Sequence, residues 1–88
     1  MSDRMSFLRE RLQTQFRPLR LDIRDDGAKH IGHAHAGHGH YTVRIVAAAF
    51  AAKSRLQRHR MVYAALGDWR QADIHALNIE ALTPDESN

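Results

Sequence analysis

The spacing of hydrophobic residues changes at Pro18, and this change constrains how the chain can fold. Before Pro18, apolar residues recur every three or four positions, as on one face of an α-helix: Met5, Leu8, Leu12 and Phe16. Proline ends the helix because it lacks a backbone N–H and its ring clashes with the preceding turn. From Leu19 to Arg24, apolar and charged residues alternate, which is the period of a half-buried strand. The sequence therefore predicts an amphipathic helix followed directly by a strand.

The rest of the chain predicts a second strand, a second helix and a third strand. Alternation returns from Tyr41 to Ile45. A helix opened by Lys53 or Ser54 would share one apolar face among four residues: Leu56, His59, Tyr63 and Leu66. A final strand is expected from Ile74 to about Leu82, with residues 83–88 frayed. The order is helix, strand, strand, helix, strand in a single α/β (α+β) domain spanning 1–88.

The segment between the first two predicted strands is longer than a tight hairpin requires. Residues 27–39 are mainly glycine, alanine and histidine and show no apolar periodicity, so we expect a functional loop. A helix between the second and third strands can act as a crossover, and neighbouring strands joined in that way are parallel. Their starts would then lie at one end of the sheet. On that condition, the loop and His75 are predicted to approach each other.

Composition excludes several kinds of protein. The chain has 88 residues, enough for one domain, and no cysteine, so it can form neither a disulfide nor an all-cysteine iron–sulfur site. It has no apolar run of membrane-spanning length, and we expect no membrane association. The start reads as a mature helix rather than a targeting segment, which predicts a cytoplasmic protein. No catalytic set is apparent, so we expect a protein that is not an enzyme.

Histidine is the unusual component: the chain has seven, and five lie between His30 and His40. Imidazole is a common ligand for zinc, copper, nickel and iron, and a glycine-rich loop can wrap around an ion. The alternative is a polar loop whose histidines are solvated, and the residues alone leave both interpretations open. Taken alone, the apolar neighbours of His75 favour a buried core histidine, and His59 is expected to be buried or half-buried.

A basic cluster accompanies the predicted second helix: Lys53, Arg55, Arg58 and Arg60. With a net charge of +3 and a pI near 10.0, it is compatible with contacts to DNA or to a protein partner. A solvated helix face is the commoner role for such a cluster. No two glycines fall three apart, so a Gly-x-x-Gly loop for RNA is absent from the sequence.

Several short motifs follow one another along the chain: Phe16-Arg17-Pro18, the strand from His40 to Val46, Arg58-His59-Arg60-Met61-Val62-Tyr63, Ile74-His75-Ala76-Leu77 and Thr83-Pro84. In this order they resemble the BolA family. The resemblance covers about 16–84. It implies a small fold similar to a class II KH domain, with a three-stranded sheet covered by helices.

The resemblance also implies a function. Members pair with monothiol glutaredoxins, and the heterodimer holds a [2Fe–2S] cluster for iron–sulfur cluster assembly, delivery or iron regulation. By resemblance, this chain would supply His75 and a loop histidine, His30, with His33 as the alternative. A glutaredoxin cysteine and glutathione would supply the other two ligands. Two imidazoles and two thiolates would resemble a Rieske centre, whose reduction potential is raised.

Two other functions remain open at this stage. One is a DNA-binding transcriptional regulator that uses Lys53, Arg55, Arg58 and Arg60. The other is a stand-alone metal-binding protein that holds other metal ions with the histidine-rich loop. A homodimer is a further alternative for the assembly.

Overall fold

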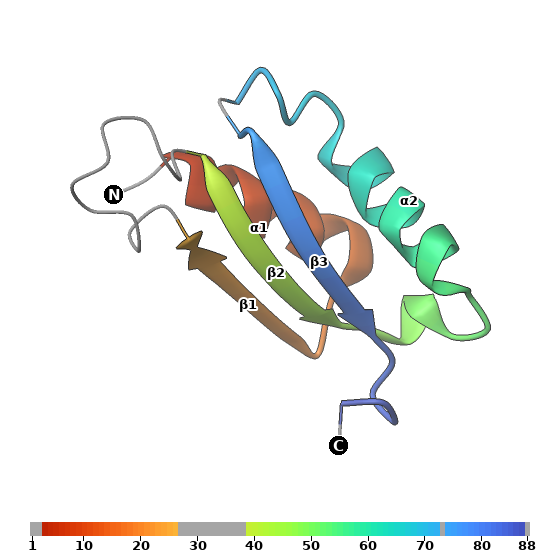
Figure 1. The fold of residues 1–88 in the computed structure, drawn as a ribbon. Helices are drawn as coiled ribbons and strands as arrows, with labels where there is room; N and C mark the ends of the chain where they lie inside the picture. The colour runs from red at the N-terminus through yellow and green to blue at the C-terminus, as the bar shows by residue number, and fades with distance from the viewer. Residues whose placement is uncertain (1–2, 27–38, 73, 88) are drawn as a thin grey trace.

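The structure is a computed structural model that describes residues 3–26, 39–72 and 74–87 (Figure 1). It is a small α+β domain with two helices and a three-stranded sheet. In chain order the elements are α1 (Asp3–Phe16), β1 (Arg20–Asp25), β2 (His40–Val46), the short 3-10 helix η2 (Ala48–Phe50), α2 (Arg55–Leu66) and β3 (Ala76–Leu82). The predicted order of helices and strands is confirmed.

The sheet has the strand order β1-β2-β3, so β2 lies in the middle. β1 pairs with β2 in antiparallel fashion, with Leu21 opposite Ile45. β2 and β3 are parallel, with His40 opposite Ala76 and Val43 opposite Ile79. The chain between them passes through α2, as a parallel pair requires. The sequence prediction that the loop and His75 approach each other required these two strands to be neighbours, and they are neighbours in the sheet.

One face of the sheet carries the hydrophobic core. Tyr41, Val43 and Ile45 point from β2 into this layer and are almost completely buried. The helices contribute apolar residues to the same core: Leu8 and Leu12 from α1, and Val62 and Leu66 from α2. Figure 1 shows α1 crossing behind the sheet and α2 running beside β3. The apolar stripe predicted for the first helix is confirmed.

The other face of the sheet is polar. Its alternate residues form exposed ion pairs, with Nε–O distances of 3.2 Å for Arg20–Asp22 and 2.9 Å for Arg44–Glu80. The Thr42 hydroxyl donates to the Asp26 carboxylate, which also accepts from Arg24. Exposed pairs of this kind contribute little to stability, typically below about 1 kcal/mol each. The core face, not this one, supports the fold.

Two sequence predictions need correction in detail. Leu56 is 59% exposed, so the predicted apolar face of the second helix is wrong at that position. The residues of α2 that are fully buried are Val62 and Leu66. Leu56 projects from a different side of the helix than Val62 does. The third strand starts at Ala76 rather than Ile74, although Ile74 is buried.

Ser54, one of the two residues predicted to open the second helix, caps the start of α2. Its hydroxyl accepts from the backbone N–H of Gln57 at 3.1 Å, and the Gln57 side-chain carbonyl accepts from the Ser54 N–H at 2.7 Å. This reciprocal capping box satisfies backbone donors that would otherwise lack partners. None of the described helices is long and apolar enough to cross a bilayer.

Candidate functional site

The parallel pairing of β2 and β3 places His75 beside the start of β2. The backbone N–H of His75 donates to the Gly39 carbonyl at 2.9 Å, and that of Ala76 donates to the same carbonyl at 3.3 Å. His40 follows Gly39 directly and is the residue opposite Ala76. Two histidines from distant parts of the sequence therefore lie at one end of the sheet, and both are exposed.

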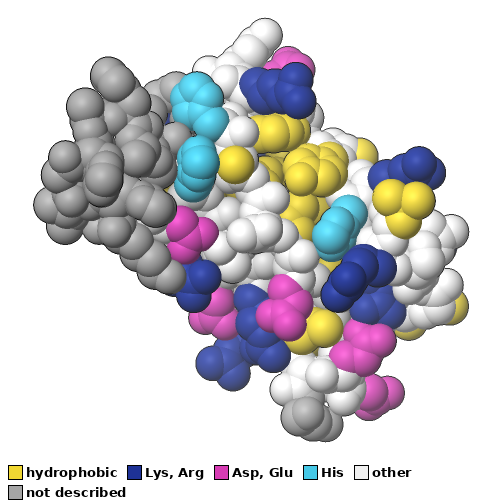
Figure 2. Space-filling model, viewed as in Figure 1, with side chains coloured by type: hydrophobic (Ala, Val, Ile, Leu, Met, Phe, Trp, Pro, Cys, Tyr) yellow, Lys and Arg dark blue, Asp and Glu magenta, His cyan; other side chains and the backbone are white. Residues whose placement is uncertain are grey.

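The exposure of His75 bears on only one of its two interpretations, the buried core histidine, and its assignment as a ligand stays a prediction. A core histidine would be buried, but His75 is exposed, so that interpretation is wrong. Ile74 takes the buried position instead, at 1% exposure. Figure 2 shows histidine side chains side by side at one end of this face and another histidine apart from them. His59, on α2, is half-buried, as the sequence predicts.

The loop histidines His30 and His33 lie outside the described residues, so their assignment as ligands stays a prediction. Within residues 3–26, 39–72 and 74–87, no group of three or more His, Asp or Glu side chains could hold a metal ion. The exposed imidazole of His75 suits iron or zinc, but the described residues offer only part of a coordination shell. No sequence pattern favoured His40 as a ligand, because its position beside His75 depends on the pairing of β2 with β3.

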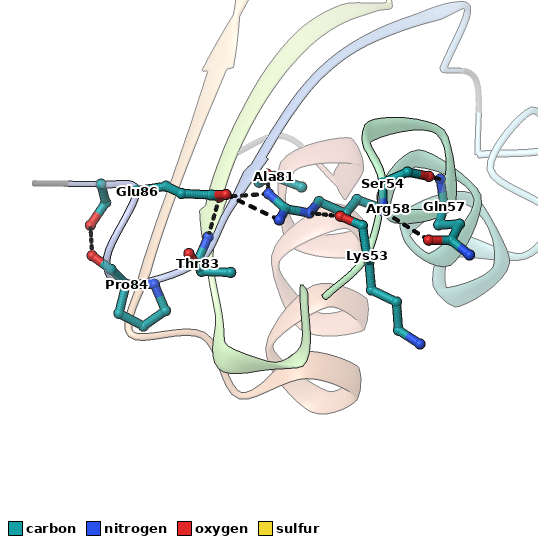
Figure 3. Close-up of polar contacts among 9 residues, drawn as sticks. Lys53, Ser54, Gln57, Arg58, Ala81, Thr83, Pro84 and Glu86 are labelled. Atoms are coloured by element: carbon teal, nitrogen blue, oxygen red, sulfur yellow. Dashed lines mark hydrogen bonds and ion pairs between the residues drawn. The ribbon is translucent and has the colours of Figure 1, made fainter. Parts of the chain in front are cut away.

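Arg58, one of the four predicted binding residues, is half-buried and is held by hydrogen bonds to other parts of the chain (Figure 3). Its Nε donates to the Lys53 carbonyl at 2.9 Å, and Nη1 donates to the Ala81 carbonyl at 3.0 Å. Nη1 and Nη2 also donate to the two carboxylate oxygens of Glu86, at 2.6 and 3.1 Å. Only 13% of the side chain is exposed. In this structure Arg58 joins α2, β3 and the C-terminal turn, rather than facing a partner.

The C-terminal residues also differ from expectation. The sequence predicts that residues 83–88 fray, whereas the structure shows a turn over 84–87. Glu86 accepts from the backbone N–H of Thr83 at 2.9 Å in addition to Arg58. The sequence-level argument considered only the polar composition of the tail, and it missed a bidentate carboxylate–guanidinium pair.

The Arg58–Glu86 contact should depend on pH. Hydrogen bonds from Arg58 and from the Thr83 backbone lower the pKa of Glu86 from 4.5 to about 2. A lowered pKa means that the contribution to stability is complete above pH 4.5 and is lost as the pH falls toward 2. We therefore expect Glu86→Gln to lower the free energy of unfolding at neutral pH, with the difference from wild type shrinking across that window. Urea unfolding at several pH values measures it, and a constant difference would contradict the contact.

The other three basic residues, Lys53, Arg55 and Arg60, are exposed. Lys53 and Arg55 line a groove of about 640 Å³ between the start of α2 and the second half of β3. Ile79, Ala81 and Glu86 form part of its opposite side. The basic cluster of the sequence is therefore divided: Arg58 is structural here, and the remaining cations border an open surface.

The chain thus forms a small α+β domain in which two helices cover the core face of a three-stranded sheet and an exposed histidine lies beside the parallel pair of strands. The family model described as BolA-like protein matches residues 12–86. The chain belongs to the BolA-like family.

Relatives and solved structures agree with this assignment. The chain is 38% identical to SufE-like protein 1 of Arabidopsis thaliana over 86 residues and 37% identical to Protein BOLA1 of the same plant over 90 residues. It covers only 23% and 56% of those proteins, respectively. The solved BolA1 of A. thaliana is similar over 100% of both chains, with 35% identity and a TM-score of 0.85. The BolA domain of SufE1 gives a TM-score of 0.84 at 38% identity, covering 98% of both chains.

Proposed function

We propose that this protein is a non-enzymatic partner of a monothiol glutaredoxin and that it co-ligates a [2Fe–2S] cluster through His75 and a second histidine. The observation that carries the proposal is the position of His75, exposed at the start of β3 and hydrogen-bonded to Gly39. Gly39 is the residue that follows the segment bearing His30 and His33. A histidine ligand from that segment would therefore come from the stretch of chain that leads directly to the residue to which His75 is hydrogen-bonded.

The chemistry of the chain is consistent with a shared site. It has no thiol, so two thiolate ligands must come from another molecule. Neutral imidazoles bind iron, and an exposed imidazole can reach a cluster held mainly by a partner. SufE-like protein 1 of Arabidopsis thaliana contains a BolA domain that is similar to this chain. Relatives named as chloroplastic or mitochondrial leave the cytoplasmic location a prediction.

The proposal is tested by mixing this protein with a monothiol glutaredoxin, glutathione, iron and sulfide under anaerobic conditions. Visible circular dichroism should give a spectrum that differs from that of the glutaredoxin alone. Separate substitutions of His30, His33 and His40 by alanine identify the second ligand, which is the one whose loss removes the new spectrum. A mixture whose spectrum is the sum of its parts would contradict the proposal.

A second candidate function is DNA binding. A relative named DNA-binding transcriptional regulator BolA, from Escherichia coli, is 31% identical over 76 residues. The observation in favour is the exposure of Lys53, Arg55 and Arg60 around the first turns of α2. Among the described residues no ion pair engages these three side chains, and cations of this kind can neutralise phosphates and so release their counterions.

For DNA binding, the triple change of Lys53, Arg55 and Arg60 to alanine is expected to weaken the affinity and to flatten its dependence on salt. Each lost phosphate contact should lower the slope of log K against log salt by about 0.9. Fluorescence anisotropy with labelled duplex DNA at several salt concentrations measures both. An unchanged slope would remove this surface from consideration.

A further inference from the structure

β3 is an edge strand, and its backbone has hydrogen-bonding capacity on the side away from β2. Ala76 donates toward β2, and the Leu82 carbonyl accepts from Ala47 on that same side. Backbone groups alternate in direction along a strand, so those of Leu77, Ile79 and Ala81 point outward. The Ala81 carbonyl confirms this direction, since it accepts from Arg58 of α2 (Figure 3).

Arg58 closes only the far end of this edge. Within the described residues, the outward N–H and C=O groups of Leu77 and Ile79 have no hydrogen-bond partner in the structure. Both side chains are half-buried and pack against the core. An edge of this kind can accept another extended segment.

The groove beside this edge has an excess of unpaired positive charge. Its two carboxylates are already engaged, Glu80 by Arg44 at 2.9 Å and Glu86 by Arg58 at 2.6 Å. No ion pair is present for Lys53 or Arg55 in the described part of the chain, and both are exposed. The groove therefore complements a carboxylate that lies next to an extended backbone.

We propose that the β3 edge binds an extended acidic peptide segment of a partner protein. The segment adds a fourth strand to the sheet by pairing with the backbone of Leu77 and Ile79. An acidic side chain at one end of the segment contacts Lys53 and Arg55. Backbone pairing of this kind provides affinity, and the side-chain contact selects the sequence. This surface does not depend on the cluster proposed above.

A peptide fits the groove better than a nucleic acid does. Glu80 and Glu86 lie in the lining of the groove. A nucleic acid carries a phosphate on every nucleotide, so it would place phosphates next to these carboxylates as well as next to the cations. A peptide, by contrast, can carry its acidic side chain at one end alone, next to Lys53 and Arg55. Its amides also match the spacing of the free backbone groups on β3, which phosphates and sugars do not.

The test uses the full chain without glutaredoxin or iron. The probes are labelled peptides of about seven residues that alternate threonine and valine and carry two aspartates at one end or the other. A matched peptide is N-methylated on alternate amides, which removes its strand-pairing donors. Fluorescence anisotropy measures affinity, and amide hydrogen exchange by NMR reports on Leu77 and Ile79.

We expect one peptide orientation to bind and to slow amide exchange at Leu77 and Ile79, and the N-methylated peptide to lose binding. Lys53→Glu and Arg55→Glu should each weaken binding by about five- to tenfold. Arg9→Glu, an exposed reversal on α1 outside the groove, is the matched control and should not change it. Equal binding of the N-methylated peptide, unchanged exchange, or preferential binding of single-stranded DNA would overturn the proposal.

Discussion

His75→Ala should remove the visible circular dichroism spectrum of the cluster shared with a monothiol glutaredoxin. The side chain is exposed at the start of β3, so its loss leaves no cavity in the core. Loss of a residue that only hydrogen-bonds to a metal ligand typically lowers metal affinity by about 10- to 100-fold. Loss of the ligand itself should lower the affinity at least as much. We therefore expect cluster affinity to fall by more than about tenfold. Titration of the chain into cluster-loaded glutaredoxin measures this affinity.

His59→Gln is the matched control, because His59 lies on α2 and lines the groove beside the second half of β3 rather than the start of that strand. It should keep the shared spectrum. Far-ultraviolet circular dichroism and urea unfolding should show that His75→Ala retains the wild-type fold and stability. A His75→Ala protein that forms the same spectrum with unchanged affinity would show that His75 is not a ligand.

Phe50→Ala should produce the largest loss of stability. Phe50 is completely buried at the end of η2, and its ring centroid lies 5.1 Å from that of Phe16 on α1. Truncation removes apolar contact and leaves a cavity between α1 and the connection from β2 to α2. We expect the free energy of unfolding to fall by about 3–5 kcal/mol, as is typical of buried phenylalanine. Urea unfolding followed by far-ultraviolet circular dichroism measures the change.

Leu56→Ala provides the comparison for Phe50→Ala. Leu56 is 59% exposed, so its truncation should change the unfolding free energy by less than about 0.5 kcal/mol. A large effect at Leu56 would mean that this side chain is covered in solution. A small effect at Phe50 would contradict the packing of η2 against α1.

Local sequence patterns predicted most of the fold because each depends on residues close together in the chain. The helical spacing of Leu8 and Leu12 and the alternation around Val43 lead directly to their buried positions. The proline at 18 and the serine at 54 mark helix boundaries through backbone chemistry alone. The family resemblance added the assignment of His75 as a ligand, which apolar neighbours alone had placed in the core.

Contacts between distant residues were not predictable in this way. The charge pattern grouped Arg58 with Lys53 and Arg55, but its carboxylate partner, Glu86, lies in the polar tail. The closeness of His75 and Gly39 depended on which strands are neighbours, a condition that no local pattern could supply. Sequence periodicity reports the face on which a residue lies, whereas the pairing of charges across elements depends on tertiary structure.

The parallel pairing of β2 and β3 couples the histidine end of the sheet to the cooperative unfolding of the domain. His75 meets Gly39 only when α2 has packed and returned the chain to the start of the sheet. A metal or cluster held by histidines from both segments would therefore bind the native state and not the unfolded one. By thermodynamic linkage, such a ligand raises the melting temperature, by an amount that grows with its concentration relative to Kd. Cluster occupancy and the lifetime of the folded domain would then rise and fall together.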